Sequence, residues 1–432
     1  MRVAYVLLAS ITWLLLQVWG VAGQGKTARS VRGRRGWRRR LRQADRDARL
    51  NGRKGPWLHV HCASLGEYEQ AAPVLRLLRT QRPDSPILLT FFSPSGKDHV
   101  PSTAADHVDY LPFDLPWEAQ RFARLMDLSD TVLVKYELWS ETIRALARRG
   151  VRVHLIAARF DPDRHPLGWT GGHTRRTLRR LHSIQVQDAR SAALCEGLGL
   201  TVTVTGDPRV DQVLNTSESA PPAAIEARMQ RLKEWKENRK LLLIGSAWPP
   251  EWDALKDVLK GVPDWVALWV PHDVHADYLA EWAGREDTEF AAHWTGHTPG
   301  PGPWKTLAYV PGNPDMLVDD EIGLLKYAYR MADLAVVGGG WGQGVHNVLE
   351  PAAFGVPVLC GPRVEGFREI EALRNVGAVQ VCSDARALLD ACARWMTDPD
   401  ERQAAGRAAA QWVEDQGGAA ERIVQTVLDG PS

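Results

Sequence analysis

From Trp57 onward, short apolar runs alternate with amphipathic stretches, and this alternation predicts strands separated by helices. Helical periodicity is clear, for example, in Gln70–Arg79 and Glu118–Leu128. Strands joined by helices of this length form parallel sheets built from βαβ units. The predicted strands are Leu58–Cys62, Ile87–Phe91, Val132–Val134, Val151–Ile156, Ile184–Val186 and Val202–Thr205 in the first half, and Leu241–Ile244, Val266–Val270, Leu307–Val310, Leu334–Val337, Val356–Cys360 and Val379–Val381 in the second.

The chain has 432 residues, too many for one ordinary core, which indicates two domains with accessory segments. Residues 215–224 (NTSESAPPAA) are rich in Ser, Pro and small residues and predict a linker. We therefore expect one domain at residues 57–214 and a second at residues 225–400. A C-terminal helix is expected at residues 401–432, packed back across the first domain.

The segment Val3–Gly23 is almost entirely apolar and, at roughly 20 residues, is just long enough for a membrane-spanning helix. A dense basic tract follows, with Asp45 as its only acid: Lys26, Arg29, Arg32, Arg34, Arg35, Arg38, Arg39, Arg40, Arg42 and Arg46. A cleaved signal peptide, a nucleic-acid arm and a membrane anchor are the possible interpretations. A signal peptide carries its charge before the apolar run, where only Arg2 stands, and a nucleic-acid arm leaves the apolar helix unexplained.

The anchor explains both features, because the positive-inside rule places a basic flank on the cytoplasmic side. We therefore predict a membrane anchor at residues 1–23 and a basic membrane-proximal segment at residues 24–56 that meets anionic lipid headgroups. The catalytic body would lie on the cytoplasmic face of the inner membrane. The sequence leaves open whether the helix spans the bilayer or lies on it.

Charge and cysteine usage narrow the class of function. Lys and Arg number 53 against 52 Asp and Glu, so no overall affinity for polyanions follows, and no nucleic-acid partner is expected. The five cysteines contain no CxxC pair and are odd in number: Cys62, Cys195, Cys360, Cys382 and Cys392. We therefore expect neither a disulfide framework nor a zinc site, and a reducing compartment for the soluble part.

A glycine-rich stretch follows the predicted strand Leu334–Val337, with glycines at Gly338, Gly339, Gly340, Gly342 and Gly344. Strand, glycine loop and helix start is an arrangement that binds nucleotide phosphates, because glycine permits close backbone approach and a helix N-terminus attracts anions. A tight βα turn without a ligand is the alternative. The polar residues His346, Asn347 and Glu350 after the loop favour the nucleotide site, since they have no obvious packing purpose.

Three charged side chains of the first half come after predicted strands, and parallel sheets bind ligands at the carboxyl ends of their strands. Glu67 follows LHVHC, Glu137 follows the run ending at Val134, and Arg209 follows VTVT. Glu67 either completes a helix-capping box with Ser64 or acts as a general base on a hydroxyl nucleophile. Glu137 is an exposed turn residue or part of the same site. Arg209 is a surface charge or a cation that neutralises a phosphate.

In the second half, polar groups again follow the strands. Gly245 and Ser246 end one strand, and His272 and Asp273 follow VALWV. His272 is either a solvated loop residue or a ligand contact.

Together these motifs resemble those of the Kdo transferases, GT-B glycosyltransferases that move 3-deoxy-D-manno-octulosonic acid (Kdo) from CMP-Kdo onto a lipid A precursor. The resemblance covers nearly the whole chain, to about Val381. Its most specific blocks are ASLGEYEQA (63–71), YLPFDLP (110–116), YELW (136–139), VTGDPRVD (204–211), GSAW (245–248), IGLLKYAY (322–329) and GGGWGQGVHNVLEPAAFGVPV (338–358). The implied fold is α/β of the GT-B type, with two Rossmann-like domains facing a cleft and an N-terminal anchor helix. The first domain would bind the acceptor and the second the CMP-sugar.

The resemblance implies an inverting, metal-independent transfer to an acceptor of the lipid IVA type, with Glu67 as general base and no cofactor besides the donor substrate. It implies that Glu137 and Arg209 support the transition state. Contacts with CMP carry over to His272, Asp273, Gly323, Leu324, Leu325, Asn347, Val348, Leu349 and Glu350. Glu350 is suited to accept hydrogen bonds from ribose hydroxyls.

The chain departs from the common family pattern at three places. Many members have Arg-His where this chain has His272-Asp273, Lys where it has Arg209, and Asn-Phe where it has Gly366-Phe367. Two other functions remain open: another GT-B nucleotide-sugar transferase or epimerase, and a catalytically silent, membrane-tethered nucleotide-sugar binder. Glu67 discriminates, because a silent binder needs no carboxylate there.

Overall fold

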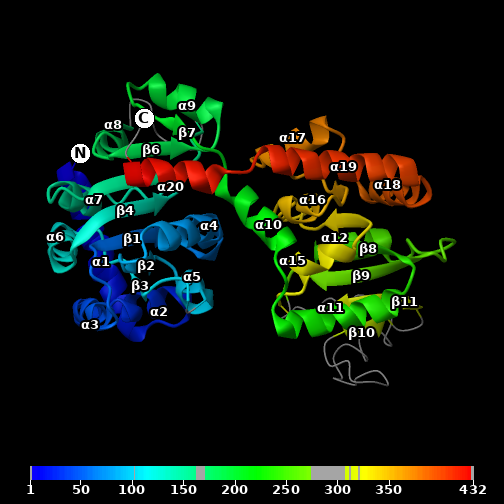
Figure 1. The fold of residues 1–432 in the computed structure, drawn as a ribbon, viewed down its shortest axis with the longest axis horizontal. Helices are drawn as coiled ribbons and strands as arrows, with labels where there is room; N and C mark the ends of the chain where they lie inside the picture. Colours follow the sequence, from blue (N-terminus) through cyan, green and yellow to red (C-terminus); the bar gives the residue numbers. More distant parts are fainter. Residues whose placement is uncertain are drawn as a thin grey trace. The chain divides into compact units, whose positions relative to one another are not determined.

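The chain folds into two compact units, shown in Figure 1. The structure is a computed structural model that describes residues 2–101, 103–161, 171–273, 307–310, 313–319 and 322–429. Unit 1 contains residues 1–212 and 417–432, and unit 2 contains residues 213–416. Each unit is built on a seven-stranded sheet, so the prediction of two parallel α/β bodies is confirmed.

The sheet of unit 1 is parallel throughout, in the order β3-β2-β1-β4-β5-β6-β7. Its strands are β1 (Trp57–Cys62), β2 (Ile87–Phe91), β3 (His107–Tyr110), β4 (Leu128–Val134), β5 (Arg152–Ala158), β6 (Ser183–Val186) and β7 (Thr203–Val204). Every residue of β1 and β2 is buried, as expected of central strands with helices on both faces. The helices that follow these strands are α4 (Leu65–Gln81), α5 (Pro94–His99), α6 (Pro116–Leu125), α7 (Ser140–Ala147), α8 (Gly172–Leu178), α9 (Ala189–Glu196) and α10 (Pro208–Glu218).

The basic segment forms two helices, α2 (Gly25–Gly33) and α3 (Trp37–Leu50), that belong to unit 1. Trp37 and Leu41 of α3 are buried in the same apolar cluster as Trp57 of β1. Arg34 is also buried and donates to the carbonyl oxygens of Leu111 and Phe92, at 2.8 and 3.0 Å. Much of the basic segment is therefore part of the folded body.

Helix α1 (Arg2–Ala22) precedes α2 and is held to unit 1 along its length. Arg2 pairs with Glu141 at 2.7 Å, and the Tyr5 hydroxyl donates to Asp114 at 2.5 Å. Further along, Trp13 meets Trp117 edge to face, with ring centroids 6.2 Å apart. The opposite side of α1 is exposed and apolar, at Val3, Leu7, Leu8, Ile11, Leu14, Leu15, Val18 and Trp19.

The sheet of unit 2 has the order β10-β11-β9-β8-β12-β13-β14, in which β10 and β11 pair antiparallel and the remaining pairs are parallel. Its strands are β8 (Lys240–Ala247), β9 (Trp265–Pro271), β10 (Leu307–Val310), β11 (Asn313–Asp319), β12 (Leu334–Val337), β13 (Val358–Cys360) and β14 (Val379–Val381). Its helices are α11 (Ala223–Lys236), α12 (Pro249–Leu255), α15 (Leu325–Ala328), the 3₁₀ helix η2 (Tyr329–Met331), α16 (Leu349–Ala353), α17 (Arg368–Asn375), α18 (Ala385–Thr397) and α19 (Pro399–Asp415).

Only the last part of the tail returns to unit 1, as helix α20 (Ala419–Asp429) (red in Figure 1). The single helix expected at residues 401–432 is instead two helices, and the first of them, α19, belongs to unit 2. Ile423, Val424 and Val427 are fully buried in one cluster with Val60 of β1. The Asp211 carboxylate caps α20, since it accepts from the N–H groups of Gly418 and Ala420 at 2.6 and 2.7 Å. The tail therefore closes one face of the first sheet.

Candidate active site

In both units the strand order places a topological switch point between two neighbouring strands. In unit 1 the chain adds β2 and β3 on one side of β1 and then continues with β4 on the other side. In unit 2, β9 and β11 lie on one side of β8, and β12 lies on the other. Open parallel sheets bind ligands at the carboxyl ends of the strands that flank such a point. The residues after β1 and β4, and those after β8 and β12, are therefore the ones that matter most.

Among the described residues, four that are not glycine have a left-handed backbone: two lie at these switch points, and the others are Ala157 in β5 and Glu237 after α11. Lys135 directly follows β4 and has a φ of 62°, and Ser246 near the end of β8 has a φ of 50°. Non-glycine residues rarely adopt this left-handed conformation, and such residues cluster at functional sites. Both switch points thus carry a backbone feature typical of a binding or catalytic site.

Glu67 lies in the first turn of α4, directly after β1, and is held through one carboxylate oxygen. The backbone N–H and the hydroxyl of Ser64 both donate to Glu67 Oε2, at 2.7 and 2.9 Å. The capping box expected from the sequence is therefore present. Glu67 Oε1 makes no hydrogen bond within the described ranges, so capping leaves this oxygen available for another task.

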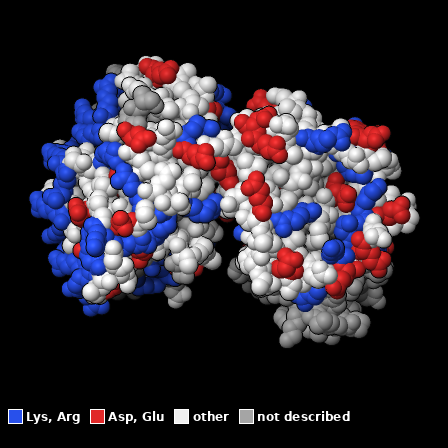
Figure 2. All heavy atoms as spheres, viewed as in Figure 1, with Lys and Arg blue, Asp and Glu red and all other residues white. Residues whose placement is uncertain are grey.

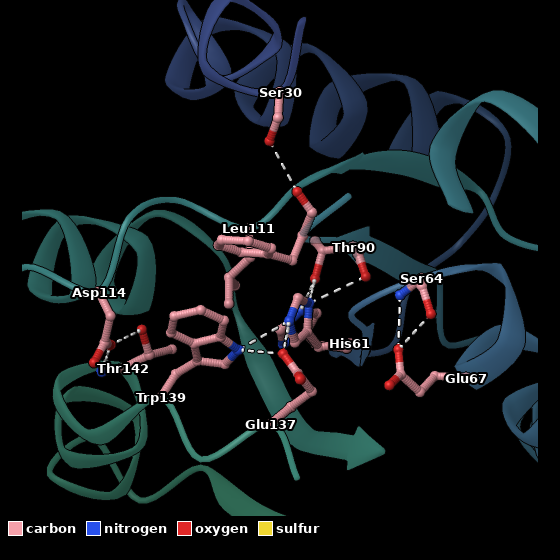
Figure 3. Close-up of polar contacts among 12 residues, drawn as sticks. Ser30, His61, Ser64, Glu67, Thr90, Leu111, Asp114, Glu137, Trp139 and Thr142 are labelled. Carbon is pink, nitrogen blue, oxygen red and sulfur yellow. Dashed lines mark hydrogen bonds and ion pairs between the residues drawn. The ribbon is translucent and has the colours of Figure 1, made fainter. Parts of the chain in front are cut away.

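Glu137 follows β4 and is held in the same one-sided way, as Figure 3 shows. The indole N–H of Trp139 donates to Glu137 Oε2 at 2.8 Å, and His61 Nε2 lies 3.2 Å from the same oxygen. The Glu137 side chain is 14% exposed, which makes it more enclosed than a turn residue in solvent. Its Oε1 has no hydrogen-bond partner among the residues that the structure describes.

Cys62, the last residue of β1, connects the two carboxylates electrostatically. Burial raises the pKa of the Cys62 thiol well above its ordinary value, and the charges of Glu67 and Glu137 raise it further. Both carboxylates therefore act on one buried group. The structure brings Glu67 and Glu137 together at the switch point of unit 1.

Arg209 occupies a different position. It lies at the start of α10 after β7, the outer strand of the sheet, and β5 and β6 separate β7 from β4. Its guanidinium pairs with Asp207 at 2.6 Å, and a quarter of the side chain is exposed. Within unit 1, Arg209 thus belongs to the same sheet edge as the two carboxylates but not to the pair of strands that holds them.

Sequence reasoning did not single out the histidines of β1. His61 Nδ1 lies 2.8 Å from Thr90 Oγ1 of β2, and that hydroxyl oxygen lies 2.8 Å from His59 Nε2. A signal was available, because two histidines separated by one residue in a strand share one face of the sheet. Their approach to Glu137 depends on the pairing of β1 with both β2 and β4, which pattern alone does not supply.

At the switch point of unit 2, three aromatic rings stack. Trp248 stacks on His272 with centroids 4.6 Å apart, and His272 stacks on His346 at 4.4 Å. Trp248 Nε1–H donates to His346 Nε2 at 3.2 Å, which requires a neutral His346 because indole nitrogen only donates. Burial lowers the pKa of His346 to about 4, and the neighbouring His272 lowers it as well. The stack presents a flat, neutral surface suited to a planar or sugar-bearing ligand.

The glycine loop after β12 is closely packed. A Cβ on Gly338 would lie 2.2 Å from the Ser246 carbonyl oxygen, and one on Gly340 would lie 2.5 Å from the Gly361 Cα atom. These glycines are required because backbone segments touch there. The N–H groups of Gly338, Gly339, Gly342 and Gly344 all donate within the protein. The predicted phosphate cradle therefore has few free donors in this conformation, and packing accounts for much of the motif.

Glu251 of α12 holds this loop and was not recognised from the sequence. It is fully buried, and its two carboxylate oxygens accept from Gly339 N–H at 2.8 Å and Trp248 N–H at 3.0 Å. Burial raises the pKa of Glu251 to about 7. No capping-box signal marks it in the sequence, because the residue three positions earlier is Trp248, which has no side-chain acceptor for a backbone N–H.

The remaining predicted donor contacts lie near this region. Asn347 caps the single turn of α16, since its Oδ1 accepts from Leu349 N–H at 3.1 Å and its amide donates to Glu350 at 3.3 Å. The charge of Glu350 also contributes, after burial, to the raised pKa of Tyr329. The side chains of Leu324, Val348 and Leu349 are buried in the core, so only their backbone groups are available to a ligand. Gly323, which precedes them, has a φ of 106° that favours glycine, and Leu325 packs against Gly245.

The structure also bears on four further expectations: the contact at Asp273, the state of the cysteines, the metal sites and the apolar N-terminal helix. Asp273 directly follows His272 and partly offsets the effect of burial on the pKa of that ring. All five cysteines are free and buried. Among the described residues, no group of three or more His, Cys, Asp or Glu side chains is arranged to hold a metal ion. One helix, Arg2–Gly20, is long and apolar enough to cross a membrane.

Comparisons with known proteins agree with this architecture. Residues 35–212 match the family described as 3-deoxy-D-manno-octulosonic-acid transferase (kdotransferase), and residues 315–412 match glycosyl transferases group 1. The 3-deoxy-D-manno-octulosonic acid transferase of Haemophilus influenzae is 28% identical over 382 residues, which cover 85% of each chain. The enzyme of the same name from Bordetella pertussis is 27% identical over 388 residues, or 86% of each chain.

A solved structure supports the fold. UDP-GlcNAc 2-epimerase from Neisseria meningitidis, bound to UDP-GlcNAc, superposes with a TM-score of 0.62 at 14% identity. The alignment covers 86% of this chain and 99% of that chain. This likeness shows the fold alone, two α/β units of the GT-B type, each built on a largely parallel sheet.

Proposed function

Because this chain belongs to the 3-deoxy-D-manno-octulosonic acid transferase family, a family of glycosyltransferases in lipopolysaccharide biosynthesis, we propose that it transfers Kdo from CMP-Kdo to a lipid A precursor of the lipid IVA type. One observation carries the proposal: Glu67 and Glu137 flank the switch point of unit 1, each anchored by one oxygen, while the other oxygen has no hydrogen-bond partner in the described part of the chain. A base and a charge-stabilising carboxylate are the groups that an inverting sugar transfer requires.

Glu67 is the general base of the proposed reaction. It takes the proton of the acceptor hydroxyl while the hydroxyl oxygen attacks the anomeric carbon of Kdo. The bond between that carbon and the phosphate oxygen breaks, and CMP leaves with the bonding electrons. Attack opposite the leaving group inverts the anomeric configuration. The anchored Oε2 fixes the orientation of the carboxylate, and Oε1 accepts the proton.

Glu137 and Arg209 support the transition state in this proposal. A carboxylate favours the positive charge that develops on the sugar as its bond to phosphate lengthens. An arginine favours the negative charge that CMP gains, and its planar fork fits phosphate oxygens. To act in this way, the Arg209 guanidinium has to exchange its contact with Asp207 for the phosphate. No metal ion and no cofactor take part in the proposed step.

Unit 2 binds the donor in this proposal. The stacked surface of Trp248, His272 and His346 receives the nucleotide, and Asn347 and Glu350 hold its polar groups. Backbone groups of residues 323–325 and 348–349 supply further contacts. Asp273, beside His272, stands where many family members have a histidine, so this chain uses a different charge at one donor contact.

Helix α1 attaches the body to the cytoplasmic face of the inner membrane in this proposal. Its exposed side is largely apolar, with Thr12 as an exposed polar residue, whereas Tyr5 and Gln17 are partly buried on the other side. An amphipathic helix that turns its polar side to the protein has only lipid as a favourable surrounding for the apolar side. Lys and Arg side chains gather on the surface of unit 1 in Figure 2, where they suit anionic headgroups.

The replacement Glu67→Gln tests the proposal. With purified protein, CMP-Kdo and a lipid A precursor, we expect kcat to fall about 10²- to 10⁴-fold, the usual contribution of a general base. Product is measured by mass spectrometry. The dissociation constant of CMP should change less than twofold, because CMP binds unit 2. The matched control is Glu69→Gln, an exposed glutamate on the same helix, which should keep full activity.

Each other outcome has a definite meaning. Near-normal turnover by Glu67→Gln would remove Glu67 from the role of base. Tight CMP binding without transfer by the unaltered protein would favour a silent nucleotide-sugar binder. Conversion of a UDP-sugar to its epimer, with no transfer of Kdo, would favour an epimerase.

A further inference from the structure

A chain of buried polar groups runs from the interior of the first sheet to Glu137. His59 and His61 of β1 are fully buried, and Thr90 of β2 lies between them with 1% of its surface exposed. Thr90 Oγ1 is 2.8 Å from His59 Nε2 and 2.8 Å from His61 Nδ1. His61 Nε2 then lies 3.2 Å from Glu137 Oε2 (Figure 3). Burying polar groups in a packed sheet costs free energy unless each group has a hydrogen-bond partner. The protons shared along this row of buried groups therefore have to be assigned.

Counting protons along these groups allows two arrangements of the ring protons, and the contact of His61 with Glu137 selects one of them. The Thr90 hydroxyl has one hydrogen, and it serves both histidines if His59 donates from Nε2 and Thr90 donates to His61 Nδ1. The remaining His61 nitrogen, Nε2, then carries the proton and donates to Glu137 Oε2. The opposite tautomer would let Nε2 accept from the Trp139 N–H at 3.0 Å, but it would also turn a bare ring nitrogen toward the Glu137 carboxylate at 3.2 Å.

The contact of His61 with Thr90 includes a carbonyl oxygen, and it does not alter the assignment. His61 Nδ1 lies 3.1 Å from the Thr90 carbonyl oxygen as well as 2.8 Å from the hydroxyl oxygen. A fully protonated ring would donate to that carbonyl and would still donate from Nε2 to Glu137. Each arrangement in which His61 donates to Glu137 places a proton on Nε2, beside the Trp139 N–H that donates to the same oxygen.

We propose that His61 is a positioning residue for the transfer reaction: it donates from Nε2 to Glu137 Oε2, fixes the orientation of that carboxylate, and leaves Glu137 Oε1 for the substrate. Thr90 and His59 hold the His61 ring from behind. The proposal rests on the proposed function, in which Glu137 stabilises charge in the transition state. A fixed, desolvated carboxylate stabilises developing charge better than a mobile one.

The test compares two replacements of His61 in the full-length enzyme. His61→Phe keeps a ring of similar size and removes the donor, so kcat should fall about 10- to 100-fold, the effect of losing a hydrogen bond to a charged group. The KM for CMP-Kdo should stay within about twofold. His61→Gln returns an N–H donor at similar reach and should recover most of the loss.

A double replacement separates positioning from simple stability. If His61 acts through Glu137, then His61→Phe should cost nothing further in a Glu137→Gln background. The matched control is His154→Phe: His154 is also a fully buried histidine of the same sheet, 3.1 Å from the carboxylate of Asp130, but away from the carboxyl ends of the strands. This control should lower the Tm and leave kcat of the folded protein unchanged.

The tautomer can be read without any activity. Long-range ¹H–¹⁵N spectra of the histidine rings should show His61 protonated at Nε2 in the unaltered protein. A ring protonated only at Nδ1 would overturn the proposal, whatever the enzyme transfers. The proposal would also be overturned if His61→Phe lowered kcat in the Glu137→Gln background by the same factor as in the unaltered protein, or if His61→Phe alone had near-normal kcat. Absence of Kdo transfer by the unaltered protein would instead refute the proposed function and leave the spectral assignment standing.

Discussion

Glu67 and Glu137 are each held through one carboxylate oxygen, and this arrangement reconciles two roles for a single side chain. Ser64 occupies Oε2 of Glu67, as a capping box requires, yet Oε1 is left over. Trp139 and His61 occupy Oε2 of Glu137 in the same way. A structural role for one oxygen therefore does not argue against a chemical role for the other.

The buried Glu251 makes stability depend on pH. Its folded pKa is raised from 4.5 to about 7, so between these values the folded chain binds a proton that the unfolded chain releases. Stability from this group is thus complete below about pH 4.5 and is lost as pH rises through 7. Between pH 5 and 8 we expect the unaltered protein to lose roughly 2 kcal/mol relative to Glu251→Gln. Urea unfolding at both pH values measures this difference, and parallel pH profiles would contradict it.

The candidate site was only partly predictable from the sequence at the scale of residues. Glu67 and Glu137 could be found because each directly follows an apolar strand. His61 and Glu251 could not, since their importance comes from contacts with Thr90 and Gly339, which are distant in sequence. For Arg209, sequence pattern predicted the correct sheet edge but not its distance in strands from the two carboxylates.

At the scale of elements, the strands were predictable where apolar and β-branched residues form unbroken runs. The predicted strand Ile87–Phe91 coincides with β2. Two strands were missed, β3 and β11, because polar residues such as His107, Asp109 and Asp315 interrupt them.

The glycine loop after β12 was predicted for only one of the two reasons that explain its composition. Its composition predicted a phosphate site, whereas its contacts with neighbouring backbone also explain why glycine is required.

The exposed side of α1 makes a testable contribution to membrane binding. Leu7 and Leu14 are 59% and 57% exposed, so replacing both with Asp should change the Tm little. Removing their burial in lipid should weaken sedimentation with anionic vesicles by about tenfold or more, since each leucine side chain contributes about 1.5 to 3 kcal/mol when fully buried. The matched control is Val376→Asp, an apolar residue of unit 2 with 44% exposure, which should bind vesicles normally. Equal binding by all three proteins would exclude α1 as the membrane contact.

At the scale of the whole molecule, the two ends of the chain contribute to unit 1 in unequal ways. The exposed side of α1 is not part of a core, whereas α20 places Ile423, Val424 and Val427 inside one. Parallel sheets and helical layers were predictable from periodicity, whereas the return of α20 was expected only from the way two-sheet architectures place a C-terminal helix. The capping of α20 by Asp211 was not, because it joins positions about 200 residues apart.

Two truncations test whether α20, but not α1, is required for the core of unit 1. Deletion of residues 1–23 should leave a cooperatively folding, active body with weaker membrane association. Deletion of residues 417–432 should uncover the face of the first sheet and leave Asp211 without its two N–H donors, so unit 1 should unfold several degrees lower or become sensitive to protease. Scanning calorimetry and limited proteolysis compare the two proteins. Equal Tm values would show that α20 does not complete the core of unit 1.

The position of helix α20 at the end of the chain also delays the completion of unit 1 during synthesis. All strands of unit 1 have been synthesised once residue 212 is added, but the helix that covers one face of their sheet is synthesised about 200 residues later. At roughly 5–20 residues per second, that interval is on the order of 10–40 seconds. During this time the growing chain carries an uncovered apolar face while the second unit is still being made. Biosynthesis of this protein should therefore depend on chaperones more than its final architecture suggests.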